Sequence, residues 1–104
     1  MRVIGTVVEQ ESGKPIAGLK VRAFDKDLIF DDKLGVATTD ANGKFRIDYS
    51  SLDFSFMNET SPELYVRVYD KNDKKLLWTS EKAIRKEVQV EEVYDIKVPK
   101  AKLG

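Results

Sequence analysis

The chain has 104 residues, a common size for one domain, and its 18 lysine and arginine residues balance 18 aspartate and glutamate residues. Because the formal net charge is zero, we expect no general attraction to nucleic acid. The absence of cysteine excludes disulfides and thiolate chemistry, and the absence of histidine excludes a histidine-dependent catalytic triad. We therefore expect a single domain over residues 1–104 that is stabilised by packing alone.

The first segment of the chain already has the pattern of a strand. It reads MRVIGTVVEQ and contains no long apolar run. This pattern indicates neither a signal peptide nor a membrane anchor. We expect a cytoplasmic protein or a module of a longer chain.

The first two predicted strands cover residues 2–9 and 19–24. The first has apolar residues on both faces, which is typical of a central or well-covered strand. Between them, Gly13 provides backbone freedom and Pro15 fixes its own φ, as a turn requires. We expect these two strands to form a hairpin.

A second hairpin is predicted around Asn42 and Gly43. Residues 36–40 precede this pair, and an alternating strand follows over residues 44–49. Asn-Gly between two such runs is the strongest short hairpin signal, and we expect a positive φ at both residues.

The second half of the chain contains a less regular succession of elements. Residues 50–62 form an apolar connection that we expect to fold over the end of the core, and residues 64–69 and 76–79 form a third hairpin. Residues 80–86 are compatible with one short helix, and residues 94–98 form a last strand. Together these elements predict an all-β fold, a seven- or eight-stranded antiparallel β-sandwich, with a barrel as the structural alternative.

Three motifs carry a resemblance to a known family. They are Gly5-Thr6-Val7-Val8, GKPIAGLKV over residues 13–21, and TDANGKFRI over residues 39–47. In order and spacing they resemble the transthyretin-like and carboxypeptidase-regulatory-like β-sandwich domains. The resemblance implies a prealbumin-like Greek-key sandwich. Its members range from hormone carriers to hydrolases and non-catalytic modules, so the fold by itself does not select a function.

The residues present argue against two kinds of enzyme with a similar fold. The hydrolases that act on 5-hydroxyisourate use histidines, an arginine and a C-terminal Tyr-Arg-Gly-Ser, whereas this chain has no histidine and ends PKAKLG. Intradiol dioxygenases of similar fold bind iron through tyrosine and histidine. We therefore predict that the chain is not an enzyme.

An acidic loop is the first candidate binding site. Clustered carboxylates on loops are what Ca²⁺ requires, and the segment is similar to the calcium loop of C2 domains. Alternatively, the aspartates cap turns and pair with neighbouring lysines such as Lys26 and Lys33, which needs no metal ion. The candidate ligands are Asp25, Asp27, Asp31 and Asp32.

The tip of the same loop is apolar and is the second candidate. Leu28, Ile29 and Phe30 could contact a protein partner or insert into a membrane, or they could tuck under the loop and close the sandwich. An unpaired sheet edge is a further way to bind a partner, by addition of a strand.

These observations predict a non-catalytic binding or structural module that mediates protein–protein interaction through loops or a sheet edge. We expect a monomer or a small homo-oligomer without a cofactor. The alternative is a Ca²⁺-dependent binding or membrane-docking domain that uses the acidic loop over residues 25–32.

Overall fold

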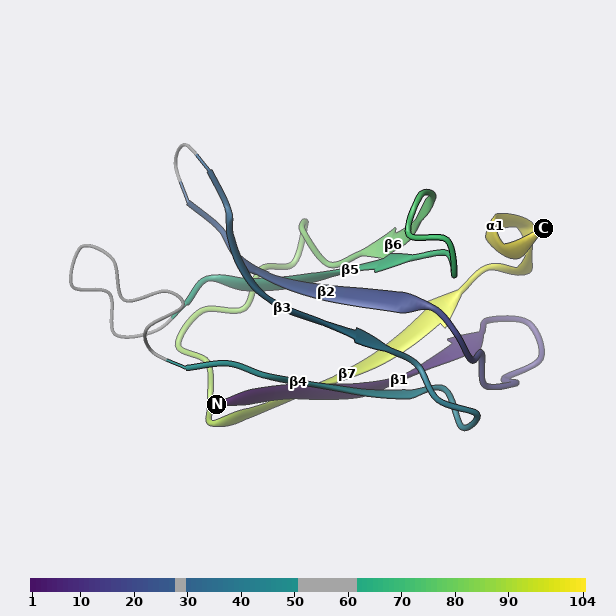
Figure 1. The fold of residues 1–104 in the computed structure, drawn as a ribbon, viewed down its shortest axis with the longest axis horizontal. Helices are drawn as coiled ribbons and strands as arrows, with labels where there is room; N and C mark the ends of the chain where they lie inside the picture. Colours follow the sequence, from purple (N-terminus) through teal and green to yellow (C-terminus); the bar gives the residue numbers. More distant parts are fainter. Residues whose placement is uncertain (28–29, 51–61) are drawn as a thin grey trace.

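The chain forms two facing β-sheets, seen in a computed structural model that describes residues 1–27, 30–50 and 62–104 (Figure 1). One sheet has the order β4-β1-β7 and the other the order β3-β2-β5-β6. The elements are β1 (Arg2–Glu9), β2 (Lys20–Asp25), β3 (Asp32–Thr38), β4 (Lys44–Asp48), β5 (Leu64–Tyr69), β6 (Leu76–Thr79), β7 (Glu91–Val98) and the helix α1 (Lys100–Leu103). The predicted all-β sandwich is confirmed, with seven strands in the described residues.

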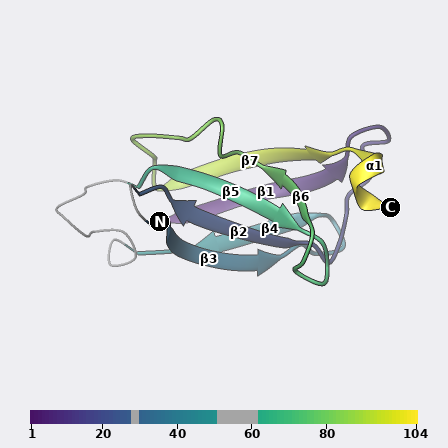
Figure 2. The same cartoon turned by 90° about the horizontal axis from the view of Figure 1, so that it is seen from above.

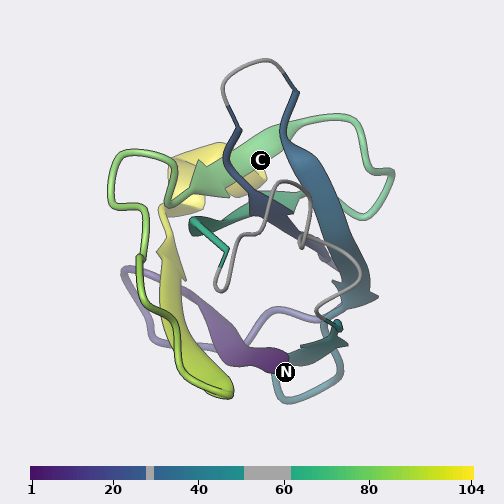
Figure 3. The ribbon, with the colours of Figure 1, turned by 90° about the vertical axis from the view of Figure 1, so that its left-hand side faces the viewer.

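The core lies between the two sheets. Figure 3 shows the sheets in a view along the strands, and Figure 2 shows them from above. Alternate residues of each strand point inward, because successive side chains of a strand lie on opposite faces. The predicted alternation in residues 64–69 is confirmed, since Leu64, Val66 and Val68 are fully buried. On the opposite sheet the core contains Val3, Val7, Phe45, Ile47, Tyr94, Ile96 and Val98.

The sandwich is not antiparallel throughout. Strand β1 pairs antiparallel with β4 but parallel with β7, from Arg2 opposite Glu91 to Glu9 opposite Val98. The segment after β6 returns along the molecule, so that β7 starts at the same end as β1 (Figure 1). Strand β1 is central in its sheet, which agrees with its predicted position.

Two of the three predicted hairpins are instead crossings between the sheets. The chain passes from β1 to β2 and from β3 to β4, and each pair of strands is divided between the two sheets. Buried Thr39 joins the two crossings: its Oγ1 accepts the Leu19 N–H at 3.0 Å and donates to the Ile16 carbonyl at 2.7 Å. The third hairpin, β5–β6, is confirmed.

The turn before β4 also differs from the prediction in its backbone. Gly43 has a positive φ of 73°, but Asn42 does not. The Gly43 N–H donates to the Asp40 carbonyl at 2.9 Å, and Asp40 Oδ1 accepts the amides of Asn42 and Lys44. A carboxylate that caps these amides allows a turn with one left-handed residue, which is Gly43.

The short helix predicted over residues 80–86 is wrong. Ser80 Oγ accepts the Val66 N–H at 2.9 Å, and Arg85 exchanges both backbone hydrogen bonds with Leu64. Between these two contacts the chain makes a turn, in which the Ala83 N–H donates to the Ser80 carbonyl at 2.8 Å, so the segment is held beside β5 without forming a helix. The described helix is α1, and no helix in the described ranges is long and apolar enough to cross a membrane. The expected fold of residues 50–62 over the core falls mostly outside the described residues, which omit 51–61.

Candidate functional site

Asp25, the first residue of the acidic loop, is part of the fold rather than of the surface. It ends β2 on the inward face and is only 1% exposed. Its Oδ1 accepts the Glu63 N–H at 2.8 Å, which ties the end of β2 to the start of β5. This carboxylate therefore has a structural hydrogen bond in place.

Asp31 lies on the other face of the sheet. It accepts a hydrogen bond from the Tyr65 hydroxyl, accepts the Asp27 N–H at 3.2 Å, and lies 3.6 Å from Lys26 Nζ. Partial burial acts to raise the pKa of Asp31, but the bonds from Tyr65 and Asp27 and the charge of Lys26 lower it overall. The predicted pairing of loop aspartates with a neighbouring lysine is thus present at Lys26.

The acidic residues do not converge. Asp32 begins β3 opposite Asp25, and within the described ranges no three acidic, histidine or cysteine residues are grouped as a metal site would need. Calcium binding by Asp25, Asp27, Asp31 and Asp32 stays a prediction. Of the apolar tip, Phe30 is 81% exposed, whereas Leu28 and Ile29 lie outside the described residues.

The outward face of the four-stranded sheet is covered by an interlocked cluster, which we call the outer cluster. Phe24 and Tyr65 stack with their ring centroids 5.1 Å apart, and the Arg67 guanidinium lies 5.2 and 5.5 Å from the two rings. Glu81 accepts from Arg67 at 2.7 Å and from Lys26 at 3.2 Å. Since both rings are buried under charged side chains that bond to one another, the outer cluster itself offers little for a ligand.

The three-stranded sheet, in contrast, has an open edge at β7. The Arg2 N–H donates to the Val90 carbonyl, and the Gln10 N–H donates to the Val98 carbonyl. The even-numbered residues from 90 to 98 therefore direct their backbone groups toward β1. In a parallel pair the alternate residues point the other way. The backbone groups of Val93, Asp95 and Lys97 therefore face away from the sheet.

Arg85 covers only the first half of this edge. Its Nη1 donates to the Val93 carbonyl at 2.8 Å and to the Glu92 carboxylate at 3.0 Å. Its guanidinium also lies 3.8 Å from the centroid of the Tyr94 ring. Along the second half, the outward backbone groups of Asp95 and Lys97 have no partner among the described residues.

Strand β7 is also the most regular of the sheet edges. Its eight residues pair with β1 without a register shift. Edge strand β3 contains a bulge opposite Ala23 and Phe24, β6 has four residues and a shift, and β4 has five residues. Bulges and short strands protect a sheet edge from pairing, so β7 is the edge best suited to accept another strand.

A hollow lies directly beside the open part of β7. It has a volume of about 470 Å³ and is bordered on one side by Thr6 and Val8 of β1. On the other side it is bordered by Asp95, Ile96 and Lys97. An added strand would place alternate side chains on this same face of the sheet, so a long side chain could reach across β7 into the hollow. We call the open edge and the hollow together the β7 site.

The sequence predicted a sheet edge as a binding element but did not identify β7. The residues 91–98 alternate in polarity like any half-exposed strand. Their position at an edge depends on the strand order, which no local pattern specifies.

Comparison with known proteins gives one family and one fold. The model of the Transthyretin-like family matches residues 12–99. Among solved structures, a 9R-lipoxygenase from Cyanothece PCC8801 is similar with a TM-score of 0.71 and 21% identity, over 94% of this chain and 16% of the lipoxygenase chain. The chain thus spans about a sixth of that enzyme, and the likeness concerns the fold alone. The search of curated proteins gives no match. The chain belongs to the Transthyretin-like family, whose domains are generally non-catalytic and serve binding or structural roles.

Proposed function

We propose that this domain is a non-catalytic protein-binding module that accepts an extended segment of a partner protein as an additional strand beside β7. The observation that carries the proposal is the outward backbone of Asp95 and Lys97, which lies at the edge of a regular eight-residue strand and has no partner in the part of the chain that the structure describes. Main-chain hydrogen bonds supply affinity in this mode of recognition, and pockets for alternate side chains supply specificity.

The side chains around the β7 site indicate what the partner segment should contain. Asp95 and Lys97 are exposed on the outward face, so a partner with a basic and an acidic residue at the opposing positions would form cross-strand ion pairs. The partner residue between these two charged ones would point to the inward face, next to buried Ile96, which favours an apolar side chain there. We expect an extended segment of alternating polarity.

The test selects short random peptides displayed on phage against the domain and maps the selected peptides by NMR amide shifts. The diagnostic variant is Asp95→Pro, which removes an N–H that β1 does not use, and edge positions tolerate proline. The matched control is Val36→Pro, because the Val36 N–H also points outward, from the edge strand β3.

Selected peptides should shift the amides of Asp95 and Lys97, bind the Val36→Pro variant normally and fail to bind Asp95→Pro. A peptide that is methylated at the backbone nitrogens facing β7 should lose binding, whereas methylation of the alternate nitrogens, which face away, should leave binding intact. This pair of peptides checks the strand geometry without changing the domain. Peptides that bind Asp95→Pro as well as the unmodified domain, or that shift only loop residues, would refute the proposal.

A further inference from the structure

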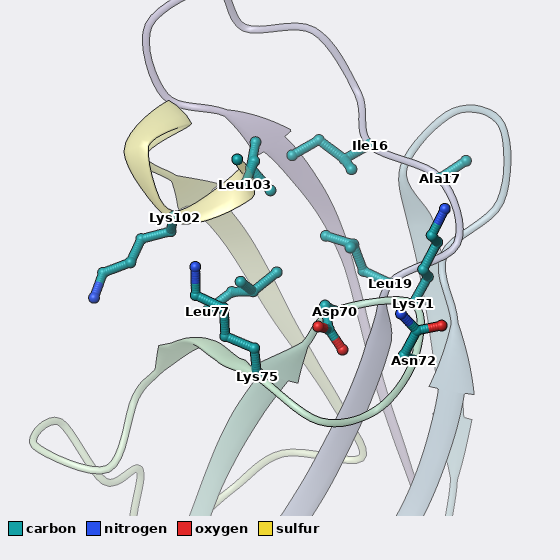
Figure 4. A pocket seen from close by; sticks show the side chains of 11 residues that line it. Ile16, Ala17, Leu19, Asp70, Lys71, Asn72, Lys75, Leu77, Lys102 and Leu103 are labelled. Carbon is teal, nitrogen blue, oxygen red and sulfur yellow. The ribbon is translucent and has the colours of Figure 1, made fainter.

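A second concave site lies at the end of the sandwich where α1 sits, away from the outer cluster and separate from the hollow of the β7 site. It is a groove of about 470 Å³ between the crossing into β2, the β5–β6 turn and α1 (Figure 4). Its floor and far wall are apolar and consist of Ile16, Leu19, Leu77 and Leu103. Leu19 and Leu77 are buried and belong to the core, so the floor is a rigid part of the fold.

The rim of this groove carries an excess of positive charge. Lys71 and Lys75 rise on either side of the floor in Figure 4, and Lys102 extends from α1. Within the described residues, none of these three lysines has a carboxylate at ion-pair distance. All three are exposed, so their ammonium groups are available to a ligand.

The one acidic side chain of the lining is engaged in the neighbouring turn. Asp70 Oδ1 accepts the Lys74 N–H at 2.9 Å. This bond and the other amides of the turn lower the pKa of Asp70, because they favour its charged form. Asp70 therefore caps the β5–β6 turn and, within the described residues, is not at ion-pair distance from the lysines of the rim.

We propose that this groove binds a single-chain amphiphile with a carboxylate head, that is, a fatty-acid anion. The acyl chain would lie on the floor made by Leu19 and Leu77, and the carboxylate would lie between Lys71 and Lys75. The volume falls within the range of small-molecule sites, and an apolar lining with a few placed polar groups is their usual character. The three lysines of the rim outnumber the one acidic side chain of the lining, so an anionic head is favoured over a cationic one, since like charges would repel. This inference goes beyond partner binding at β7 and involves different residues.

The experiment titrates the domain with laurate below its micelle concentration and follows binding by calorimetry and NMR. The double variant Lys71→Glu/Lys75→Glu reverses the charge at the head position. The matched control, Lys33→Glu/Lys44→Glu, makes the same change in net charge at exposed lysines outside the groove. Dodecyltrimethylammonium supplies the same chain with a cationic head.

Laurate should shift the signals of Leu19, Leu77 and Leu103. The groove variant should bind it about tenfold more weakly, as expected when two exposed attractions become repulsions, and the control variant normally. Leu103→Asn should also weaken binding, since it makes one apolar wall polar while leaving the lysines in place. Dodecyltrimethylammonium should bind the unmodified domain more weakly than laurate and the groove variant more tightly. The proposal would be overturned by laurate affinity that ignores the charge reversal, by shifts confined to other residues, or by equal binding of both amphiphiles.

Discussion

The outward side of the four-stranded sheet and the open side of the three-stranded sheet use their polar groups in opposite ways. In the outer cluster, Arg67 and Lys26 share Glu81, and the rings of Phe24 and Tyr65 are buried beneath them. At the β7 site, the backbone of Asp95 and Lys97 has no described partner, and a hollow lies beside it. A dense set of charged and aromatic residues can therefore be structural, while the edge strand β7, where we propose that a partner binds, has no such set.

The physical reason is that bonded polar groups gain little from a ligand. Each group of the outer cluster would have to give up an existing contact before it could form a new one, and the net gain of a hydrogen bond is only about 1 kcal/mol. The outward backbone groups of Asp95 and Lys97, which have no partner among the described residues, would give up only hydrogen bonds to water when they bind another strand. Substitutions in each of the two sheets, a change of pH and addition of a metal ion test this difference.

The largest effect is expected from Tyr65→Ala in the outer cluster. Tyr65 is fully buried and stacks on Phe24, so its removal leaves a cavity under Arg67. We expect the free energy of unfolding to fall by about 3–5 kcal/mol, measured by chemical denaturation. The control is Tyr69→Ala on the same side of the same strand, where the side chain is only partly buried and the loss should be much smaller. Equal losses would mean that the outer cluster is not packed as described.

The next effect concerns the three-stranded sheet, at Gly5. A Cβ placed there would lie 2.2 Å from the Tyr94 carbonyl oxygen and 2.7 Å from the Phe45 ring, so β1 and β7 would have to separate. We expect Gly5→Ala to cost about 1–3 kcal/mol of unfolding free energy. Gly35→Ala should cost less, because the close atom there is Cγ2 of the Ile47 side chain, at 2.6 Å, rather than backbone. The reverse order in a denaturation series would contradict the register of β1 and β7.

A smaller effect is expected at acidic pH. Hydrogen bonds from Arg67 and Lys26 lower the pKa of Glu81, while partial burial opposes them. A lowered folded-state pKa gives stability that is present above the unfolded value of about 4.3 and is lost as the pH falls through the folded value. Glu81→Gln should reduce the free energy of unfolding at neutral pH by about 1 kcal/mol and by less at low pH.

The control for the acid prediction is Glu87→Gln, at an exposed position without a described ion pair. Urea titrations at several pH values should show its stability curve parallel to that of the unmodified domain. If Glu81→Gln gave the same parallel curve, the charge of Glu81 would not stabilise the fold through Arg67 and Lys26.

The smallest effect is expected from metal ions. The carboxylates of Asp25 and Asp31 already accept hydrogen bonds from Glu63 and Tyr65, and within the described ranges no three acidic residues are grouped as an ion would need. We expect the melting temperature to be the same with Ca²⁺ and with EDTA. A melting temperature that rises with Ca²⁺ concentration would favour the alternative function at the acidic loop.

Local patterns in the sequence predicted local structure well. The alternation of residues 64–69 predicted a half-buried strand, and Gly43 predicted a turn. The same patterns failed wherever the outcome depended on distant residues. A turn sequence does not specify whether the next strand joins the same sheet, so the crossing held by Thr39 was predicted as a hairpin.

The sites illustrate the same limit. Asp25 and Asp31 are close in sequence, but their carboxylates lie on opposite faces of the sheet. Asp25 accepts the Glu63 N–H on the inward face, and Asp31 accepts the Tyr65 hydroxyl on the outward face. Proximity in sequence therefore did not produce a cluster. The β7 site depends on the parallel pairing of residues 2–9 with residues 91–98, a pairing that no short motif encodes.

The most direct test of binding at β7 is residue-resolved amide hydrogen exchange, measured without and with a selected peptide. In the free domain, the amides of Tyr94 and Ile96 should exchange slowly because they bond to β1, whereas those of Asp95 and Lys97 should exchange rapidly. With the peptide bound, Asp95 and Lys97 should become protected as well. If these two amides are already protected in the free domain, or stay unprotected in the complex, β7 is not the edge that binds a partner strand.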